Sequence, residues 1–155
     1  MLVARVQVCV IYAHAAIGKL STEEWKDGTA LHYWFMDPVF GVAEWSAPII
    51  GPLVATGLGV AALTWGTVLL ELGLAAGIVA GRWWRWGLLA LGTALHTGIA
   101  LLLGLVTFGI TMIGALVLYL VRDGDVAVLR RELAGRADDR APAGPMSSAD
   151  GRVIS

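Results

Sequence analysis

The sequence predicts an all-α integral membrane protein with about four transmembrane helices, an outer amphipathic segment and a disordered C-terminal tail. Hydrophobic residues make up 57% of the 155 residues and the mean hydropathy is +0.74, far above the values of a soluble domain with a polar surface. Between Glu44 and Arg122 the charged residues are limited to Glu71, Arg82 and Arg85. A chain of this size cannot hide so long a stretch from water, so we expect it to lie in a bilayer.

The first two spans follow from the rule that a helix needs about 20 apolar residues to cross a bilayer. Residues 2–20 form the first span. This span also resembles a signal peptide, because small residues at its end imitate a cleavage site. The second apolar run, 47–81, is too long for one span, and its Gly-Pro pair at 51–52 predicts a break. We therefore expect an interfacial helix and then a span over residues 59–80.

The third apolar run, residues 87–121, must turn back on itself. As one helix it would be about 50 Å long, whereas the hydrocarbon core is about 30 Å thick. A turn between Gly104 and Gly109 gives two spans, over residues 86–104 and 107–121. Residues 122–155 are rich in Ala, Asp, Pro, Gly and Ser and are expected to form a largely disordered tail.

The orientation of the spans is predicted by the basic residues in short loops, which favour the cytoplasmic side. Arg5 precedes the first span, Arg82 and Arg85 connect the second and third, and Arg122 follows the fourth. With four spans these residues share one side. The N- and C-termini are therefore expected to be cytoplasmic, and the segment 21–58 is expected to lie outside.

Several classes of function are excluded by composition and spacing. The net charge is −1 and the basic residues are scattered, so no electrostatic surface for nucleic acid is expected. The single cysteine, Cys9, has no partner in this chain for a disulfide. No metal-ligand spacing, nucleophile elbow or phosphate loop is present, so no metal site is predicted. Any chemistry would be acid/base chemistry at a membrane interface.

Two of the predicted spans carry polar stripes. An uncompensated charge in mid-span costs about 3 kcal/mol or more, so Glu71 needs a partner or a proton. Glu71 shares a helical face with two threonines of its span, and His96 shares one with two threonines of the next. The threonines on the Glu71 face are Thr64 and Thr67, and those on the His96 face are Thr93 and Thr97. The simplest arrangement has the stripes facing each other with Glu71 hydrogen-bonded to His96, either as a structural pair or as part of a proton or ligand site.

Lys19, at the outer end of the first span, has two interpretations. Its ammonium can extend to the interface at little cost. Alternatively, Tyr12 and two small alanines share its helical face and allow another helix to approach closely, and a lysine in so dry a place can act as a general base. Trp25 and His32, in the segment that follows, are candidate lining residues of such a site.

Four sequence motifs together resemble the horizontally transferred transmembrane (HTTM) superfamily, which includes the vitamin K-dependent gamma-carboxylases. They are Y-x-x-A-x-x-x-K-L at residues 12–20, W-x-x-G at 25–28, LTWGTVLLELGL at 63–74 and LHTGIALLLGLVTFGITMIGAL at 95–116. The resemblance covers about residues 6–121. It implies that Lys19 matches the base that deprotonates vitamin K hydroquinone in the carboxylases, and that Glu71 and His96 correspond to polar residues that support the pocket.

The chain also departs from the carboxylases. They have a second lysine where this chain has Gly18, and they carry further helices and a large substrate-binding domain. The chain is closer in style to the sporulation-delaying-protein B group of the same superfamily, whose members resemble partners in the maturation of a secreted peptide toxin. Even these are longer at the N-terminus, so the chain is expected to correspond to a C-terminal half or a truncated remnant.

These observations lead to one main hypothesis and two alternatives. We expect a multi-pass protein of the bacterial cytoplasmic membrane that assists the maturation of a secreted peptide through an outward-facing pocket. Lys19 would be its base, Glu71 and His96 its support, and Tyr12, Trp25 and His32 its lining. The alternatives are a carboxylase-like, quinone-dependent enzyme and a non-catalytic adaptor or remnant. Expected partners are the lipid bilayer, the peptide, a further membrane protein or a second copy of the chain, but no nucleic acid.

Overall fold

The described part of the chain is entirely helical, as predicted. The computed structural model describes residues 2–39, 41–122, 124–128 and 131, and no strand occurs among them. The chain divides into two units, Met1–Arg122 and Asp123–Ser155. Most of the predicted disordered tail lies outside the described residues, and residues 124–128 of it are helical. The first unit contains helices α1 (Leu2–Lys19), α2 (Glu23–Lys26), α3 (Ala30–Met36), α4 (Ala47–Val54), α5 (Gly57–Ala76), α6 (Arg82–Leu102) and α7 (Val106–Leu120).

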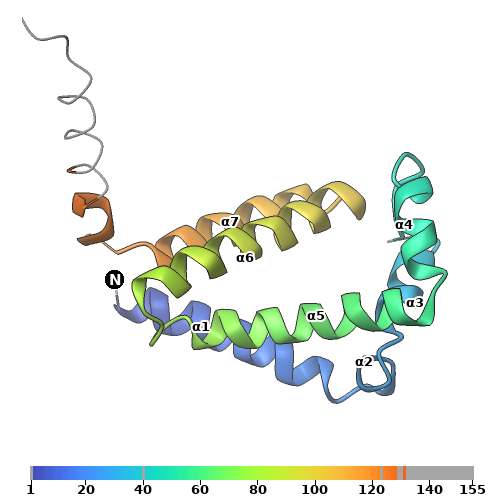
Figure 1. The fold of residues 1–155 in the computed structure, drawn as a ribbon, viewed down its shortest axis with the longest axis horizontal. Coiled ribbons are helices and arrows are strands. Elements are labelled where there is room, and N and C mark those ends of the chain that lie inside the picture. Colours follow the sequence, from blue (N-terminus) through green and yellow to red (C-terminus); the bar gives the residue numbers. More distant parts are fainter. Residues whose placement is uncertain (1, 40, 123, 129–130, 132–155) are drawn as a thin grey trace, which may run out of the picture. The chain divides into compact units, whose positions relative to one another are not determined.

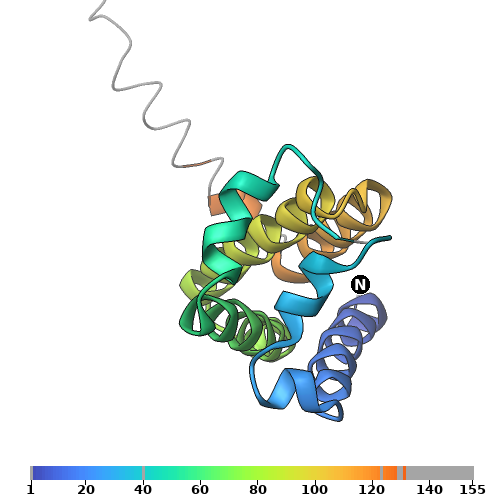
Figure 2. The ribbon, with the colours of Figure 1, turned by 90° about the vertical axis from the view of Figure 1, so that its right-hand side faces the viewer.

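Four long helices, α1, α5, α6 and α7, form a bundle in which successive members run in opposite directions (Figure 1). α1 packs against α5 and α6 packs against α7, and the two pairs meet through α5 with α6 and through α1 with α7 (Figure 2). The central core consists of Val8, Tyr12, Leu74, Leu116, Tyr119 and Leu120. Because α1 supplies two of these buried side chains, it is a structural member of the bundle.

The predicted turn in the third apolar run is present. α6 ends at Leu102 and α7 begins at Val106. Gly104 between them has φ +70°, a left-handed conformation that only glycine adopts without strain. Two further glycines let the helices approach closely: a Cβ on Gly92 would lie 2.7 Å from Leu116, and one on Gly109 would lie 2.7 Å from Ala100.

Fewer helices than expected have the length and composition of a membrane span. In the described residues only α1 and α5 do, with 18 and 20 residues and mean hydropathies of 1.2 and 1.6. α6 is long enough, but it begins with the sequence RWWRW. α7 is apolar but has 15 residues, so it is about 22 Å long and shorter than the hydrocarbon core of about 30 Å. The composition of the helices thus supports two spans more strongly than four.

The connection between α1 and α5, residues 20–56, is more structured than an outer loop with one interfacial helix. It contains the three short helices α2, α3 and α4, of which α3 and α4 pack against α5. Trp25 and Ala30 are buried with Val68 of α5 in one small core, and Ile50 and Val54 are buried with Val60 in another. The connection therefore covers the N-terminal part of α5.

Arginines gather at the opposite end of the bundle, where α5 and α7 end. Their guanidinium groups donate to carbonyl oxygens that have no partner within a helix because they belong to its last turn or follow it. The donor and acceptor pairs are Arg5 Nη2 to Val121 O at 3.2 Å, Arg85 Nε to Leu120 O at 3.0 Å and Arg122 Nη2 to Ile78 O at 3.0 Å. Residues predicted to share one side of the membrane thus share one end of the bundle.

Candidate functional site

The central feature of the candidate site is an ion pair between Lys19 and Glu71. Lys19 is the last residue of α1, and its Nζ lies 2.7 Å from both Oε1 and Oε2 of Glu71 on α5. The side chains are 22% and 11% exposed. A carboxylate that cannot reach water is stabilised by a cation that donates to both of its oxygens. The predicted hydrogen bond between Glu71 and His96 is therefore wrong, because both carboxylate oxygens of Glu71 accept from Lys19 instead.

His96 on α6 is hydrogen-bonded to Tyr12 on α1 instead. The Tyr12 hydroxyl oxygen lies 2.8 Å from His96 Nε2, and both side chains are buried. The ring of Phe108 on α7 packs edge-on against His96 at a centroid distance of 5.7 Å. His96 Nδ1 is buried and has no hydrogen-bond partner within the part of the chain that is described.

The two pairs form one cluster. Tyr12 and Glu71 are close enough to interact electrostatically, and so are His96 and Lys19. Tyr12 and Lys19 share a face of α1, and Ala16 between them is fully buried, as the helical spacing predicted. The packing of α1 against α5 and the hydrogen bond from Tyr12 to His96 on α6 thus bring four polar side chains from three helices together.

Trp25 covers the ion pair from the side of the connection. Lys19 Nζ lies 5.2 Å from the centroid of the Trp25 ring, a distance at which an ammonium is attracted to an aromatic face. Trp25 is itself buried, against Val68 of α5. The predicted lining residue Trp25 therefore does lie beside Lys19.

The threonines of the α5 stripe form their hydrogen bonds away from α6. Thr64 Oγ1 accepts a hydrogen bond from the backbone N–H of Leu31 at 3.2 Å, and Thr67 Oγ1 donates to Leu63 O in its own helix at 2.9 Å. On α6, Thr97 is exposed. Thr64 therefore holds the connection against α5, whereas Glu71 and His96 form the hydrogen bonds of the polar cluster.

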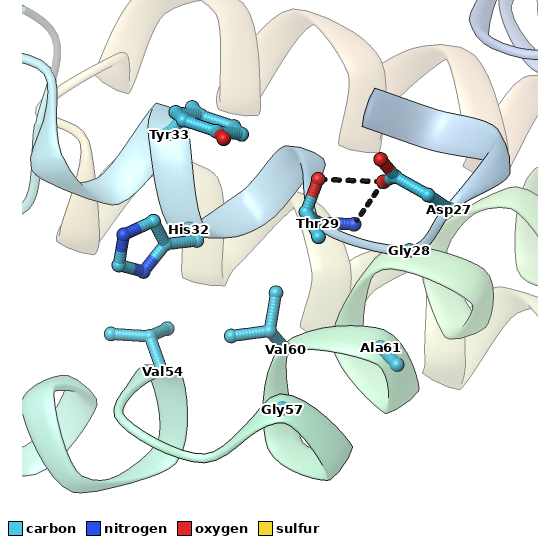
Figure 3. Close-up of a pocket in the computed structure, with 9 residues that line it drawn as sticks. All are labelled: Asp27, Gly28, Thr29, His32, Tyr33, Val54, Gly57, Val60 and Ala61. Carbon is cyan, nitrogen blue, oxygen red and sulfur yellow. Dashed lines mark hydrogen bonds between the residues drawn. The ribbon is translucent and has the colours of Figure 1, made fainter. Parts of the chain in front are cut away.

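His32 lies elsewhere. It is an exposed residue of α3 and lines a pocket between the connection and the first turns of α5, together with Asp27, Tyr33 and Val60 (Figure 3). Lys19, Glu71 and His96 do not line this pocket. The structure thus brings Lys19, Glu71, His96, Tyr12 and Trp25 together and leaves His32 at a second place.

The pairing of Lys19 with Glu71 was not predicted, although one signal pointed to it. Lys19 and Arg5 are the basic residues of α1, and they lie at its two ends. A buried carboxylate favours a cation over a neutral imidazole, because it has a full charge to compensate. Applied to Glu71, this rule would have favoured Lys19 over His96.

The fold and the cluster define a helical membrane protein with a partly buried ion pair in its bundle. Over 120 residues the chain is 39% identical to the sporulation-delaying protein SdpB of Bacillus subtilis (strain 168), an alignment that covers 77% of this chain and 37% of SdpB. Over 119 residues it is 37% identical to the uncharacterized protein YitO of the same organism, covering 76% of this chain and 38% of YitO.

These similarities confirm the predicted relationship to SdpB. The chain spans just over a third of the length of the two curated relatives. No protein-family model and no solved structure matches it, so membership of the HTTM superfamily stays a prediction.

Proposed function

We propose that this chain is a multi-pass protein of the bacterial cytoplasmic membrane that assists the maturation of a secreted peptide toxin, with Lys19 as a general base. Its similarity to a sporulation-delaying protein supports the biological setting. The observation that carries the proposed chemistry is the Lys19–Glu71 pair, which lies inside the bundle, is covered by Trp25 and is still 22% exposed at the lysine.

The ion pair has a simple route to a neutral amine. Lys19 Nζ donates to both carboxylate oxygens at 2.7 Å, so one proton can pass from the ammonium to the carboxylate without any movement of heavy atoms. The product is a neutral amine next to a neutral carboxylic acid. The amine then takes a proton from the substrate and becomes an ammonium again, while the acid proton stays on Glu71.

The other members of the cluster would position this pair. The hydrogen bond between Tyr12 and His96 ties α1 to α6, and so holds the helix that ends in Lys19 in place. The proposed proton transfer uses Lys19, Glu71 and the substrate, and the quinone that the family resemblance implies has no step in it.

The proposed topology has four spans, cytoplasmic termini and an external connection. The arginines that gather at one end of the bundle support it, since basic residues are enriched on the cytoplasmic side. The opposite end, with the connection and Trp25, would then face outward, toward a secreted peptide. The shortness of α7 fits a bundle that is completed by a further membrane protein or a second copy of the chain.

The test is the secretion of mature peptide from cells that carry this gene together with the gene of a candidate peptide substrate. Lys19→Arg keeps a cation that can bond Glu71 through two donors, but an arginine is not deprotonated in proteins. We expect Lys19→Arg to abolish the mature peptide, measured by mass spectrometry, at an unchanged amount of membrane protein. The control is Lys26→Arg, since Lys26 forms an exposed pair with Glu23 and should tolerate the change.

A non-catalytic adaptor is the second candidate. It is supported by the same ion pair, because Lys19 already donates to both carboxylate oxygens of Glu71. In that case the pair only joins α1 to α5, and Lys19→Arg would retain maturation. The two candidates thus predict opposite results for one variant.

A further inference from the structure

The pocket that contains His32 has two chemically different sides. Its volume is about 350 Å³, at the lower end of the range for small-molecule sites. Asp27, His32 and Tyr33 line it from the connection, and the side chains of Val54 and Val60 point toward them from α4 and α5 (Figure 3). The pocket therefore combines an apolar floor with a polar rim.

The rim has one carboxylate oxygen to offer. Asp27 Oδ1 accepts hydrogen bonds from the backbone N–H of Thr29 at 3.0 Å and from its hydroxyl at 2.6 Å. Among the described residues no donor bonds Oδ2. The turn thus uses one oxygen to hold the carboxylate in a defined orientation, and the other remains available to a cation.

The connection around the pocket is negatively charged, like the Asp27 carboxylate. Residues 20–56 contain five carboxylates and one lysine, a net charge of −4 with histidine neutral. Such a segment attracts cations and repels anions, including anionic lipid headgroups. The apolar floor further favours a ligand that carries an aliphatic group beside its positive charge.

We propose that this pocket binds a cationic, apolar segment of the peptide on which the protein acts, with a lysine or arginine side chain paired to Asp27 and a neighbouring aliphatic side chain against Val54 and Val60. This inference rests on the proposed function and specifies the chemistry of its substrate. Asp27 follows α2 directly, and α2 carries the Trp25 that covers Lys19. A peptide held here would lie against the segment that controls access to the ion pair.

Binding can be measured directly with a defined probe. The protein is placed in phosphatidylcholine nanodiscs, and binding of a Leu-Lys-Leu-Lys amide, labelled at its N-terminus with an uncharged BODIPY dye, is followed by fluorescence anisotropy. The matched probe is Leu-Glu-Leu-Glu, and nanodiscs without protein give the background. We expect the cationic probe to bind at least tenfold more tightly than the acidic one, and to weaken as salt is added, because exposed charge pairs are screened.

Three variants separate the pocket from general attraction. Gly57→Leu should weaken binding at least tenfold, since a Cβ at Gly57 meets nothing within 4 Å and the side chain would fill the pocket. Asp27→Asn keeps the oxygen that Thr29 uses and removes the charge, so a two- to fivefold loss is expected, roughly the value of an exposed ion pair. The control is Glu44→Gln, an exposed acid outside the pocket, which should change affinity by less than about 1.5-fold.

Three results would each overturn the inference: equal binding of the two probes, unchanged binding by a folded Gly57→Leu protein, or equal losses for Asp27→Asn and Glu44→Gln. Thermal unfolding shows whether the Gly57→Leu protein is folded, and Asp27→Asn tests the pocket independently. Failure here is distinguishable from failure of the proposed function. If the protein does not bind the probe but maturation still depends on Lys19, only the proposed pocket is wrong. If the probe binds but Lys19→Arg leaves maturation unchanged, only the proposed base is wrong.

Discussion

The Lys19–Glu71 pair predicts an asymmetric response to the loss of each partner. At 2.7 Å and an effective dielectric constant of about 20, the Coulomb attraction is about 6 kcal/mol. Desolvation of two partly buried ions offsets most of this gain. Replacing both partners should therefore destabilise the bundle less than replacing one partner and leaving the other buried without a counter-charge.

Lys19→Met should lower the free energy of unfolding by about 3 kcal/mol, because Glu71 is only 11% exposed in mid-helix and cannot reach water. Glu71→Leu should cost about 1 kcal/mol, because Lys19 is at a helix end and can extend its ammonium to solvent. The double variant should be within about 1 kcal/mol of the wild type, since apolar residues of similar volume replace buried pairs well.

The assay is equilibrium unfolding in mixed micelles with increasing SDS, followed by circular dichroism. The control is Lys26→Met, which removes an exposed pair and should cost less than about 0.5 kcal/mol. The reasoning is refuted if the effects of the two single substitutions add up to that of the double variant, or if Lys19→Met is as stable as the wild type.

Two further predictions concern the residues around the pair and the connection. Tyr12→Phe leaves the buried His96 without its hydrogen bond to Nε2 and should cost about 1–2 kcal/mol in the same unfolding assay; a loss below about 0.3 kcal/mol would show that the bond contributes little. Gly28→Ala should cost more than about 1 kcal/mol, because φ is +82° and the new Cβ would lie 3.2 Å from a side chain of α5. The control Gly18→Ala should be neutral or stabilising, because its Cβ would have nothing within 4 Å. Equal effects of the two substitutions would contradict the conformational argument.

The helices of this protein were predictable because their signals are local. The four long helices lie at residues 2–19, 57–76, 82–102 and 106–120, within a few residues of the expected spans except at the end of the second and the start of the third. At that boundary α5 ends at Ala76 and α6 begins at Arg82. Apolar run length and glycine position are read from neighbouring residues, so no tertiary information was needed.

The sequence alone therefore determined the helical fold, the turn at Gly104 and the shared face of Tyr12 and Lys19, since each depends on residues within a few turns of one another. Only the tertiary structure decided that Lys19 meets Glu71 and Tyr12 meets His96, across sequence separations of 52 and 84 residues. Those partners depend on how far each helix is shifted along its neighbour and on which face it presents. Packing of the whole bundle sets both, and no single segment encodes either.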